Sequence, residues 1–277
     1  MTTETTLRLD GRTAIITGAA GLIGSALSAG FAANGANVVL VDRDAAGLAR
    51  LAAELGGAAT GIECDVTDLA AIDEMVREVT SRLGAIDVLV NNAGGNQRVL
   101  PHEVTLDGWR HITELNLLSS FFVSQRVGLQ MIAAGRGSII NISSTCGCSA
   151  MGRGNIVFSA AKAGVNHLTR ELALEWGASG IRVNAIAPSQ VDSAGMRQWM
   201  AEAGPDGRPV GDTLLAGVPL GRLVRAEDIV GPALFLASDA SRMVTGTVIP
   251  VDGGNLSANL AGTVGRPLPA AAAQPAT

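Results

Sequence analysis

Hydrophobic residues in this chain gather in short continuous runs, and each run is followed by a longer stretch of Ala-rich or amphipathic helical pattern. Uninterrupted runs rich in Val and Ile are typical of parallel strands that are buried on both faces of a sheet. The predicted strands are 13–17, 37–42, a run that ends at 64–66, 86–90, 138–142 and 181–186. The predicted helices reach about 34, cover 68–83 and 114–134, and begin again near 155. Strands that alternate with helices predict an α/β fold with a parallel sheet.

Composition fits that fold and narrows the range of partners. A chain of 277 residues is long enough for one large α/β domain with a buried core. Hydrophobic residues make up 47% and charged residues only 16%, which indicates that part of the surface is buried between subunits. The net charge is −5 and no basic cluster is present, so we expect no nucleic-acid partner.

Cysteines, histidines and the N-terminal residues bear on location and on metal binding. Cys64, Cys146 and Cys148 lack zinc-site spacing and are expected to be space-filling thiols in a reducing compartment rather than a redox pair. The three histidines lie far apart in the sequence, so we expect no metal site. The first residues lack a hydrophobic signal region, and no apolar run has membrane-spanning length. We therefore expect a cytoplasmic protein with no membrane contact.

A glycine-rich turn follows the first predicted strand and opens the first predicted helix. Its glycines are Gly18, Gly21 and Gly24, and Leu22 and Ile23 lie inside it. Glycines let a pyrophosphate approach the backbone, and the free N–H groups of a helix N-terminus attract its negative charge. A strand, a glycine turn and a helix in this order predict a dinucleotide site.

A carboxylate at the end of the second predicted strand bears on which dinucleotide binds. Asp42 can accept hydrogen bonds from both ribose hydroxyls of NAD, and it would repel the 2′-phosphate of NADP. The sequence therefore favours NAD as the cofactor. Arg43 offers the opposite possibility, because a guanidinium can bind that phosphate. A further alternative is that Asp42 only caps the next helix.

Two further motifs carry the most specific signal in the chain. The quartet Asn-Asn-Ala-Gly at 91–94 follows the fourth predicted strand, and the segment 141–162 contains Ser144, Phe158 and Lys162. With the glycine turn and the C-terminal pattern at 245–254, these motifs resemble the short-chain dehydrogenase/reductase family over residues 8–257. The common turn of that family is TGxxxGxG, whereas this chain has TGxxGxxG, a spacing more typical of the family's extended branch.

The resemblance implies a fold, a domain layout and an assembly. The fold is a single doubly wound Rossmann domain, with seven parallel strands and helices on both faces. We expect this domain over 1–261, with 190–218 as an irregular substrate lid and 262–277 as a disordered tail. The C-terminal end of such proteins usually forms an interface between subunits, so we expect a homotetramer.

The resemblance also implies roles for individual residues in binding the cofactor. Asp65 and Val66 correspond to the pair beside the adenine, and Lys162 corresponds to the lysine that binds the ribose. Val191 and Ser193 correspond to the positions that hold the nicotinamide amide. The cofactor residues implied by the motifs are Gly18, Gly21, Leu22, Ile23, Gly24, Asp42, Arg43, Asp65, Val66, Asn92, Ala93, Gly94, Lys162, Pro188, Val191 and Ser193.

Four residues correspond to the catalytic positions of the family. Asn116 would hold a water linked to the lysine, Ser144 would hold the substrate oxygen, and Lys162 would lower the pKa of a neighbouring tyrosine. That tyrosine is replaced by Phe158, and the chain contains no Tyr at all. Thr145 is an alternative to Ser144, because the separation from Phe158 is one residue longer than the commonest spacing.

Phe158 leaves three explanations of the function open. The pattern favours an NAD-dependent alcohol dehydrogenase or ketone reductase in which Phe has replaced Tyr. The second explanation is an enoyl- or dienoyl-thioester reductase, a branch that also lacks the tyrosine. The third is a non-catalytic nucleotide-binding subunit. Gln97, Arg98 and Arg153 flank the expected substrate pocket; we interpret them as exposed solubilising residues, with binding of an anionic substrate as the alternative.

Overall fold

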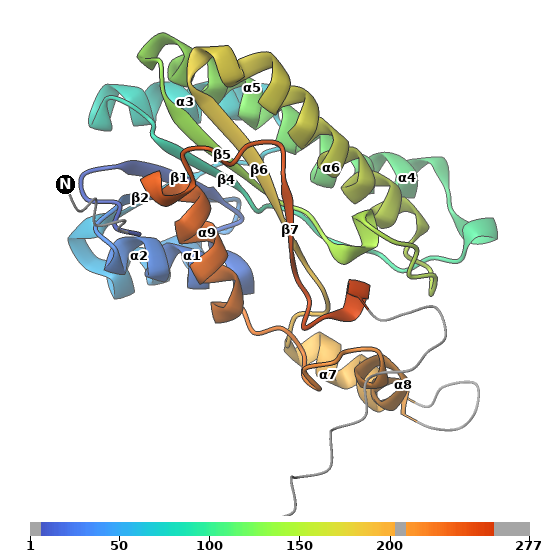
Figure 1. Cartoon of the computed structure of the whole chain (residues 1–277). Helices are drawn as coiled ribbons and strands as arrows, with labels where there is room; N and C mark the ends of the chain where they lie inside the picture. Colours follow the sequence, from blue (N-terminus) through green and yellow to red (C-terminus); the bar gives the residue numbers. More distant parts are fainter. Residues whose placement is uncertain (1–6, 203–208, 258–277) are drawn as a thin grey trace, which may run out of the picture.

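A computed structural model describes residues 7–202 and 209–257, and in this part of the chain a parallel sheet of seven strands forms the centre (Figure 1). The strands lie in the order β3-β2-β1-β4-β5-β6-β7, and each neighbouring pair is parallel. The order reverses between β1 and β4, and such a reversal leaves a crevice at the carboxyl ends of the strands. The strands are β1 (Thr13–Thr17), β2 (Asn37–Asp42), β3 (Ala59–Glu63), β4 (Val88–Asn91), β5 (Gly137–Ile142), β6 (Ile181–Pro188) and β7 (Val248–Val251).

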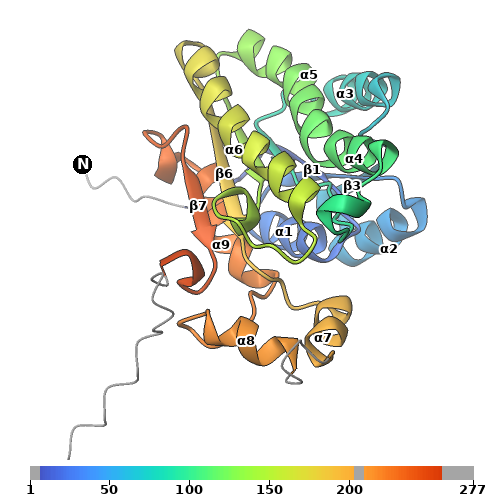
Figure 2. The same cartoon turned by 90° about the vertical axis from the view of Figure 1, so that its right-hand side faces the viewer.

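Helices cover both faces of the sheet, so the predicted doubly wound α/β fold is confirmed (Figure 2). One apolar core, which contains Leu27, Phe31 and Ile229, packs α1 and α9 on one face beside α2. A second core contains Val123 and Met131, and α3, α5 and α6 cover this other face, with α4 at its end. Among the described helices, none is long and apolar enough to cross a membrane. The helices on the sheet are α1 (Leu22–Ala33), α2 (Ala45–Leu55), α3 (Leu69–Leu83), α4 (Leu106–Thr113), α5 (Ser119–Ala134), α6 (Ile156–Trp176) and α9 (Glu227–Ala237).

The third strand is shorter than predicted. β3 ends at Glu63, whereas the sequence predicts that it ends at 64–66. The Asp65 carboxylate accepts hydrogen bonds from Thr67 N (2.9 Å) and Thr67 Oγ1 (2.7 Å). A side chain that bonds the backbone two residues on favours a turn over extended backbone, and this turn ends the strand early.

The helix predicted over 114–134 also differs, because it begins earlier and is interrupted. α4 begins at Leu106, where Thr105 Oγ1 caps the helix by accepting a hydrogen bond from Gly108 N at 3.1 Å. A π-helical turn, η3 (Glu114–Leu118), then joins α4 to α5. Such turns insert a residue into a helix and frequently occur at functional sites. The turn contains Asn116, one of the predicted catalytic residues.

The segment 190–218 contains two helices, although the sequence predicts an irregular lid. α7 (Ala194–Ala201) begins after Ser193, whose hydroxyl oxygen accepts a hydrogen bond from Met196 N at 3.1 Å. α8 (Val210–Ala216) contacts α7, and both helices lie beyond the carboxyl ends of the strands (Figures 1 and 2). Their role as a lid stays a prediction. The predicted disordered tail, 262–277, lies outside the described residues.

Candidate active site

The glycine turn between β1 and α1 fits closely against the end of β4. Gly18 has a φ of +64°, and a Cβ atom there would lie 2.8 Å from Ala93 Cα. A Cβ atom on Gly24 would lie 2.1 Å from the carbonyl oxygen of Gly18, so no side chain fits at this point. The turn therefore leads its backbone directly to the start of α1, where free N–H groups can meet a phosphate.

The Asn-Asn-Ala-Gly quartet ties the glycine turn to β4. The Asn92 side-chain amide donates hydrogen bonds to the carbonyl oxygens of Thr17 (2.9 Å) and Gly18 (3.0 Å). Thr17 Oγ1 accepts hydrogen bonds from the backbone N–H groups of Asn92 and Ala93, each at 3.0 Å. Asn92 therefore holds the backbone of the glycine turn against the end of β4.

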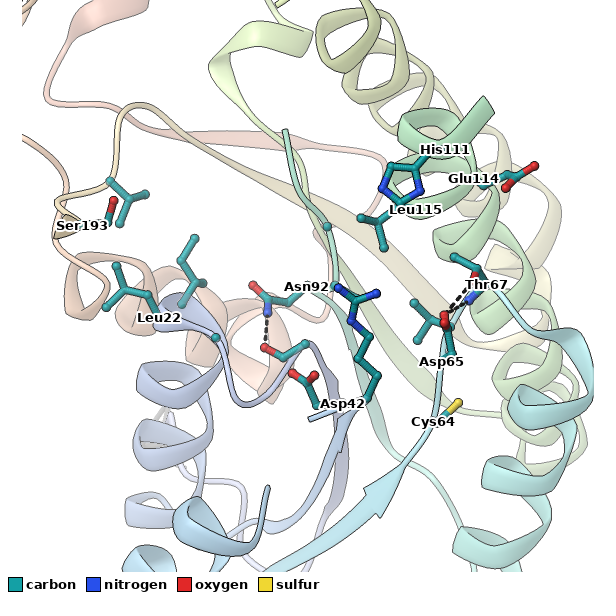
Figure 3. Close-up of a pocket in the computed structure, with 18 residues that line it drawn as sticks. Leu22, Asp42, Cys64, Asp65, Thr67, Asn92, His111, Glu114, Leu115 and Ser193 are labelled. Atoms are coloured by element: carbon teal, nitrogen blue, oxygen red, sulfur yellow. Dashed lines mark hydrogen bonds between the residues drawn. The ribbon is translucent and has the colours of Figure 1, made fainter. Parts of the chain in front are cut away.

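Asp42 ends β2 with its carboxylate fixed against the glycine turn (Figure 3). Its Oδ2 accepts a hydrogen bond from Ala20 N at 3.0 Å, and its Oδ1 accepts one from Asp44 N at 3.1 Å. Each oxygen keeps a lone pair that could accept a ribose hydroxyl. The alternative that Asp42 caps the next helix is wrong, because Asp44 caps α2 by accepting from Gly47 N at 3.0 Å. Asp42 and the exposed Arg43 both line a cavity beside the glycine turn.

Asp65 lies across the same cavity from the glycine turn (Figure 3). Two hydrogen bonds hold the pKa of Asp65 below its ordinary value. The one from the Thr67 hydroxyl contributes most, and the one from the Thr67 backbone N–H contributes less. Asp65 is therefore charged at neutral pH. Its bonds to Thr67 orient the loop after β3, which the resemblance places beside the adenine.

Most of the predicted cofactor residues line one cavity of about 530 Å³ (Figure 3). Three of them do not line it, namely Gly24, Lys162 and Pro188. The predicted residues on its wall are Gly18, Gly21, Leu22, Ile23, Asp42, Arg43, Asp65, Val66, Asn92, Ala93, Gly94, Val191 and Ser193. Wall residues that the motifs did not indicate are Cys64, Thr67, His111, Glu114 and Leu115.

A second cavity, of about 330 Å³, adjoins the first and shares Val191 with it. Ser144, Thr145 and Phe158 line this second cavity. Ser144 Oγ accepts a hydrogen bond from Cys146 N at 3.2 Å. Thr145 Oγ1 is buried and has no hydrogen-bond partner in the described part of the chain. Both residues line the cavity, and the choice between them as the ligand of a substrate oxygen stays open.

Lys162 lies buried behind Phe158. Its Nζ donates a hydrogen bond to the carbonyl oxygen of Ile142 at 2.8 Å and lies 5.7 Å from the centroid of the Phe158 ring. Burial lowers the pKa of Lys162 to about 8, because the protein interior disfavours the ammonium. An amine in this place can change protonation state near physiological pH.

Asn116 is fully buried, and its side chain contacts the loop after the Asn-Asn-Ala-Gly quartet. Its Nδ2 donates to the carbonyl oxygens of Gly95 (2.8 Å) and Ile112 (2.9 Å), and its Oδ1 accepts from Gly95 N at 3.2 Å. A Cβ atom on Gly94 would lie 2.7 Å from that Oδ1 and 3.5 Å from Lys162 Nζ. The π-helical turn thus brings Asn116 close to the lysine, as the resemblance implies.

Comparisons with known proteins agree with this arrangement. A family profile described as Enoyl-(Acyl carrier protein) reductase matches residues 18–255. The chain is 39% identical to a D-threitol dehydrogenase of Mycolicibacterium smegmatis over 251 residues, which are 89% of this chain and 94% of that protein. It is 40% identical to a sorbitol dehydrogenase of Cereibacter sphaeroides, over 90% of this chain and 99% of that one. The chain belongs to the short-chain dehydrogenase/reductase family.

A solved structure shows the same fold as this short-chain dehydrogenase/reductase. The crystal structure of a gluconate 5-dehydrogenase from Burkholderia cenocepacia, in complex with NADP and tartrate, matches with a TM-score of 0.85. It is 37% identical to this chain and covers 91% of this chain and 98% of its own.

The family motifs gave little signal for the far wall of the second cavity. Trp199, Thr213 and Leu214 come from a segment that the family motifs do not cover. Arg98 and Arg153 are exposed, as interpreted from the sequence, and both also line this cavity. In the sequence, the only signal for this place on the cavity wall was that the two arginines flank the expected substrate pocket.

Within residues 7–202 and 209–257, no three His, Cys, Asp or Glu side chains form a group that could hold a metal ion.

Proposed function

We propose that this short-chain dehydrogenase/reductase uses NAD(H) to transfer hydride between the nicotinamide and a secondary alcohol or ketone of the polyol class. The observation that carries the proposal is the shared wall of the two cavities at Val191. A dinucleotide in the first cavity would present its reactive ring to a small molecule in the second. Relatives that are dehydrogenases of threitol and sorbitol support the polyol class.

The residues of the first cavity fit a dinucleotide. Gly18 and Gly24 form a close-packed turn that a Cβ atom would fill, and the Asp42 carboxylate keeps acceptors toward the cavity. In this proposal the turn holds the pyrophosphate, Asp42 holds the adenosine ribose, and Val191 with Ser193 holds the nicotinamide amide. The bound cofactor supplies or accepts the hydride.

The residues of the second cavity position the substrate but lack the usual proton donor. Ser144, with Thr145 beside it, can hold the substrate oxygen by a hydrogen bond. The Phe158 ring has no proton to exchange, and a missing general acid or base lowers the rate by roughly 10²–10⁴-fold. Correct placement of the reacting groups would survive this loss, because it depends on binding. We therefore propose slow turnover in this form.

Restoring the hydroxyl tests the proposal. Phe158→Tyr should raise turnover on a polyol or its ketone by roughly 10²-fold or more, because a phenol beside the buried Lys162 can exchange the proton. Cofactor affinity should hardly change, since Phe158 does not line the first cavity. Absorbance of the reduced cofactor follows the reaction. Phe121→Tyr on α5 adds the same oxygen outside the cavities and should leave turnover unchanged.

Reduction of an activated double bond is a second candidate function. It is favoured by the absence of a proton-exchanging group at position 158 and by the description of the matching family profile. A crotonyl-type thioester should then oxidise reduced cofactor in the Phe158 form, with no gain in Phe158→Tyr. That result, together with no activity of either form on alcohols or ketones, would replace the first proposal. Cofactor binding without turnover of any substrate would indicate a non-catalytic subunit.

A further inference from the structure

We propose that the substrate of the second cavity is a small polyhydroxylated anion, whose carboxylate or phosphate is bound by Arg98 and Arg153. This inference rests on the proposed function and names the class of substrate for the same site. It is carried by the way two loops bring these arginines together on the cavity wall.

The two loops are joined by a pair of hydrogen bonds. Val99 N donates to the carbonyl oxygen of Gly154 at 3.0 Å, and Asn96 Nδ2 donates to Asn155 Oδ1 at 2.7 Å. Gly154 has a φ of +76°, and a Cβ atom there would lie only 3.0 Å from Val99 N. The loop after β4 and the loop before α6 therefore lie in direct contact. Arg98 and Arg153 each adjoin a bonded residue, and both line the second cavity.

Trp199 of α7 holds both guanidinium groups from a third side. The central carbon of the Arg98 guanidinium lies 3.6 Å from the centroid of the Trp199 ring, and that of Arg153 lies 5.6 Å from it. Stacking on an aromatic face orients a guanidinium while its N–H donors stay free for a ligand. Arg153 has a φ of +56°, a strained value for a residue with a side chain, so the fold holds this arginine in place against a cost.

Among the described residues, no carboxylate forms a salt bridge with Arg98 or Arg153 at this site. No Asp or Glu within 7–202 and 209–257 lines the second cavity. Glu202 attracts Arg98, but burial and repulsion from Arg153 outweigh it and lower the pKa of Arg98. Two guanidinium groups that repel each other favour an anionic ligand, because an anion between them would relieve the repulsion.

Polar atoms on the same wall suit hydroxyl groups. Thr145 Oγ1 and Gln190 Oε1 are buried and have no hydrogen-bond partner within the described residues. Buried polar atoms of this kind are nearly always satisfied by a ligand, a water or the protein. The amide oxygen of Gln190 can accept a hydrogen bond from a hydroxyl, and the Ser144 and Thr145 hydroxyls can donate or accept. A volume of about 330 Å³ fits a compact molecule of this chemistry.

Calorimetry on the NAD-saturated protein tests this inference. Sorbitol, gluconate and sorbitol 6-phosphate share a polyol chain and differ in their terminal group. One or both of the anions should bind at least about 10-fold more tightly than sorbitol, with affinity that falls as salt rises. Gluconate as the tighter ligand would identify a carboxylate, and sorbitol 6-phosphate as the tighter ligand would identify a phosphate. Arg98→Gln and Arg153→Gln should each remove most of this preference without weakening sorbitol.

Arg77→Gln is the matched control, because Arg77 is paired with Glu74 on α3, away from both cavities. It should leave all three affinities unchanged. Equal binding of sorbitol and both anions, or equal losses for all three ligands in the arginine variants, would overturn the inference. If Phe158→Tyr turns over sorbitol with no preference for an anion, only the substrate class fails. If Phe158→Tyr turns over no alcohol or ketone at all, the proposed function fails with it.

Discussion

Phe158 differs from a tyrosine by one oxygen atom, and that atom would be the proton donor of the second cavity. The ring lines the second cavity, and the Lys162 amine lies behind it at 5.7 Å from the ring centroid. A tyrosine at this position would place a phenol beside a buried cation, which lowers a phenol's pKa. The site therefore keeps the arrangement for activating a proton donor while the donor itself is absent.

The Asp42 carboxylate is the group on which we base a prediction of cofactor choice. We predict that NAD(H) binds at least about 10-fold more tightly than NADP(H), because the fixed carboxylate of Asp42 would face the 2′-phosphate and repel it. Asp42→Asn should narrow this difference. Titration calorimetry with both cofactors measures it. Equal or tighter binding of NADP(H) by the unaltered protein would contradict the prediction and assign the 2′-phosphate to Arg43.

The buried Lys162 should make stability depend on pH. Its pKa is about 8 in the folded protein against an ordinary 10.5, so between these values the unfolded chain binds more protons. The free energy of unfolding contributed by this group should therefore rise with pH from about 8 to 10.5, by at most about 1.4 kcal/mol per pH unit. Below pH 8 the cost of burying the charge is fully present.

Urea unfolding of the cofactor-free protein and of Lys162→Met across this range measures the effect. Burial raises the pKa of Cys64 to about 11, so this thiol makes the free energy of unfolding fall as pH rises. Both proteins contain Cys64, so its effect cancels in the comparison. The chain has no tyrosine to titrate in the same window. The unaltered protein should gain stability relative to the variant as pH rises. Parallel pH profiles would show that Lys162 is not desolvated as the structure indicates.

At the scale of elements, the glycine turn and the π-helical turn η3 position the residues around the two cavities. The glycine turn leads β1 into α1 with the backbone of Gly18 packed directly against Gly24, where no Cβ atom fits. The π-helical turn η3 directs Asn116 at the loop after β4, and that loop carries Arg98. Two short departures from regular structure therefore shape both cavities.

Gly24→Ala should disrupt the first of these turns. A Cβ atom 2.1 Å from the Gly18 carbonyl oxygen must push the turn away from α1, and overpacking of this kind costs typically about 1–3 kcal/mol. We expect a lower melting temperature and at least about 10-fold weaker NAD(H) binding. Gly57→Ala is the control, since a Cβ atom there has no heavy atom within 4 Å. Unchanged cofactor affinity in Gly24→Ala would show that the turn does not hold the dinucleotide.

At the scale of the whole molecule, the first cavity lies at the carboxyl ends of β1 and β4, where the strand order reverses. The second cavity lies beside it, among the segments that follow β4, β5 and β6. α7 and α8 stand beyond the carboxyl ends of the strands (Figure 2). Trp199 of α7 lines the second cavity. The substrate side is therefore built partly from a segment that the sheet does not fix. This is the part of such a fold where substrate preference can change without altering the cofactor site.

We predict that the protein is a homotetramer with two-fold axes. Several large apolar side chains are exposed on the single chain, including Leu129 (60%) on α5, Leu174 (79%) on α6 and Met243 (92%). Association would remove this surface from water. Light scattering at micromolar concentration should give four chains, and Leu174→Glu should weaken the assembly. A monomer at that concentration would contradict the prediction, and Leu83→Glu on α3 serves as a control for the added charge.

The sequence by itself determined the fold and most of the residues that line the first cavity. Short apolar runs that alternate with helical segments favour strands buried on both faces, and the Gly18–Gly24 turn after β1 is typical of a phosphate site. These signals are local, because they depend on residues within a few positions of one another. The same reasoning placed Asp42 at the end of β2.

Only the tertiary structure decided the substrate side. Arg98, Arg153 and Trp199 come from three separate loops or helices, and no local pattern links them. Their contact depends on two loops that meet through the Val99–Gly154 hydrogen bond. The turn that ends β3 early is formed by the hydrogen bonds between Asp65 and Thr67, which outweigh the tendency of residues 64–66 to continue the strand. Long-range contacts of this kind follow from the packed fold, which is why the sequence indicated the cofactor site but left the substrate open.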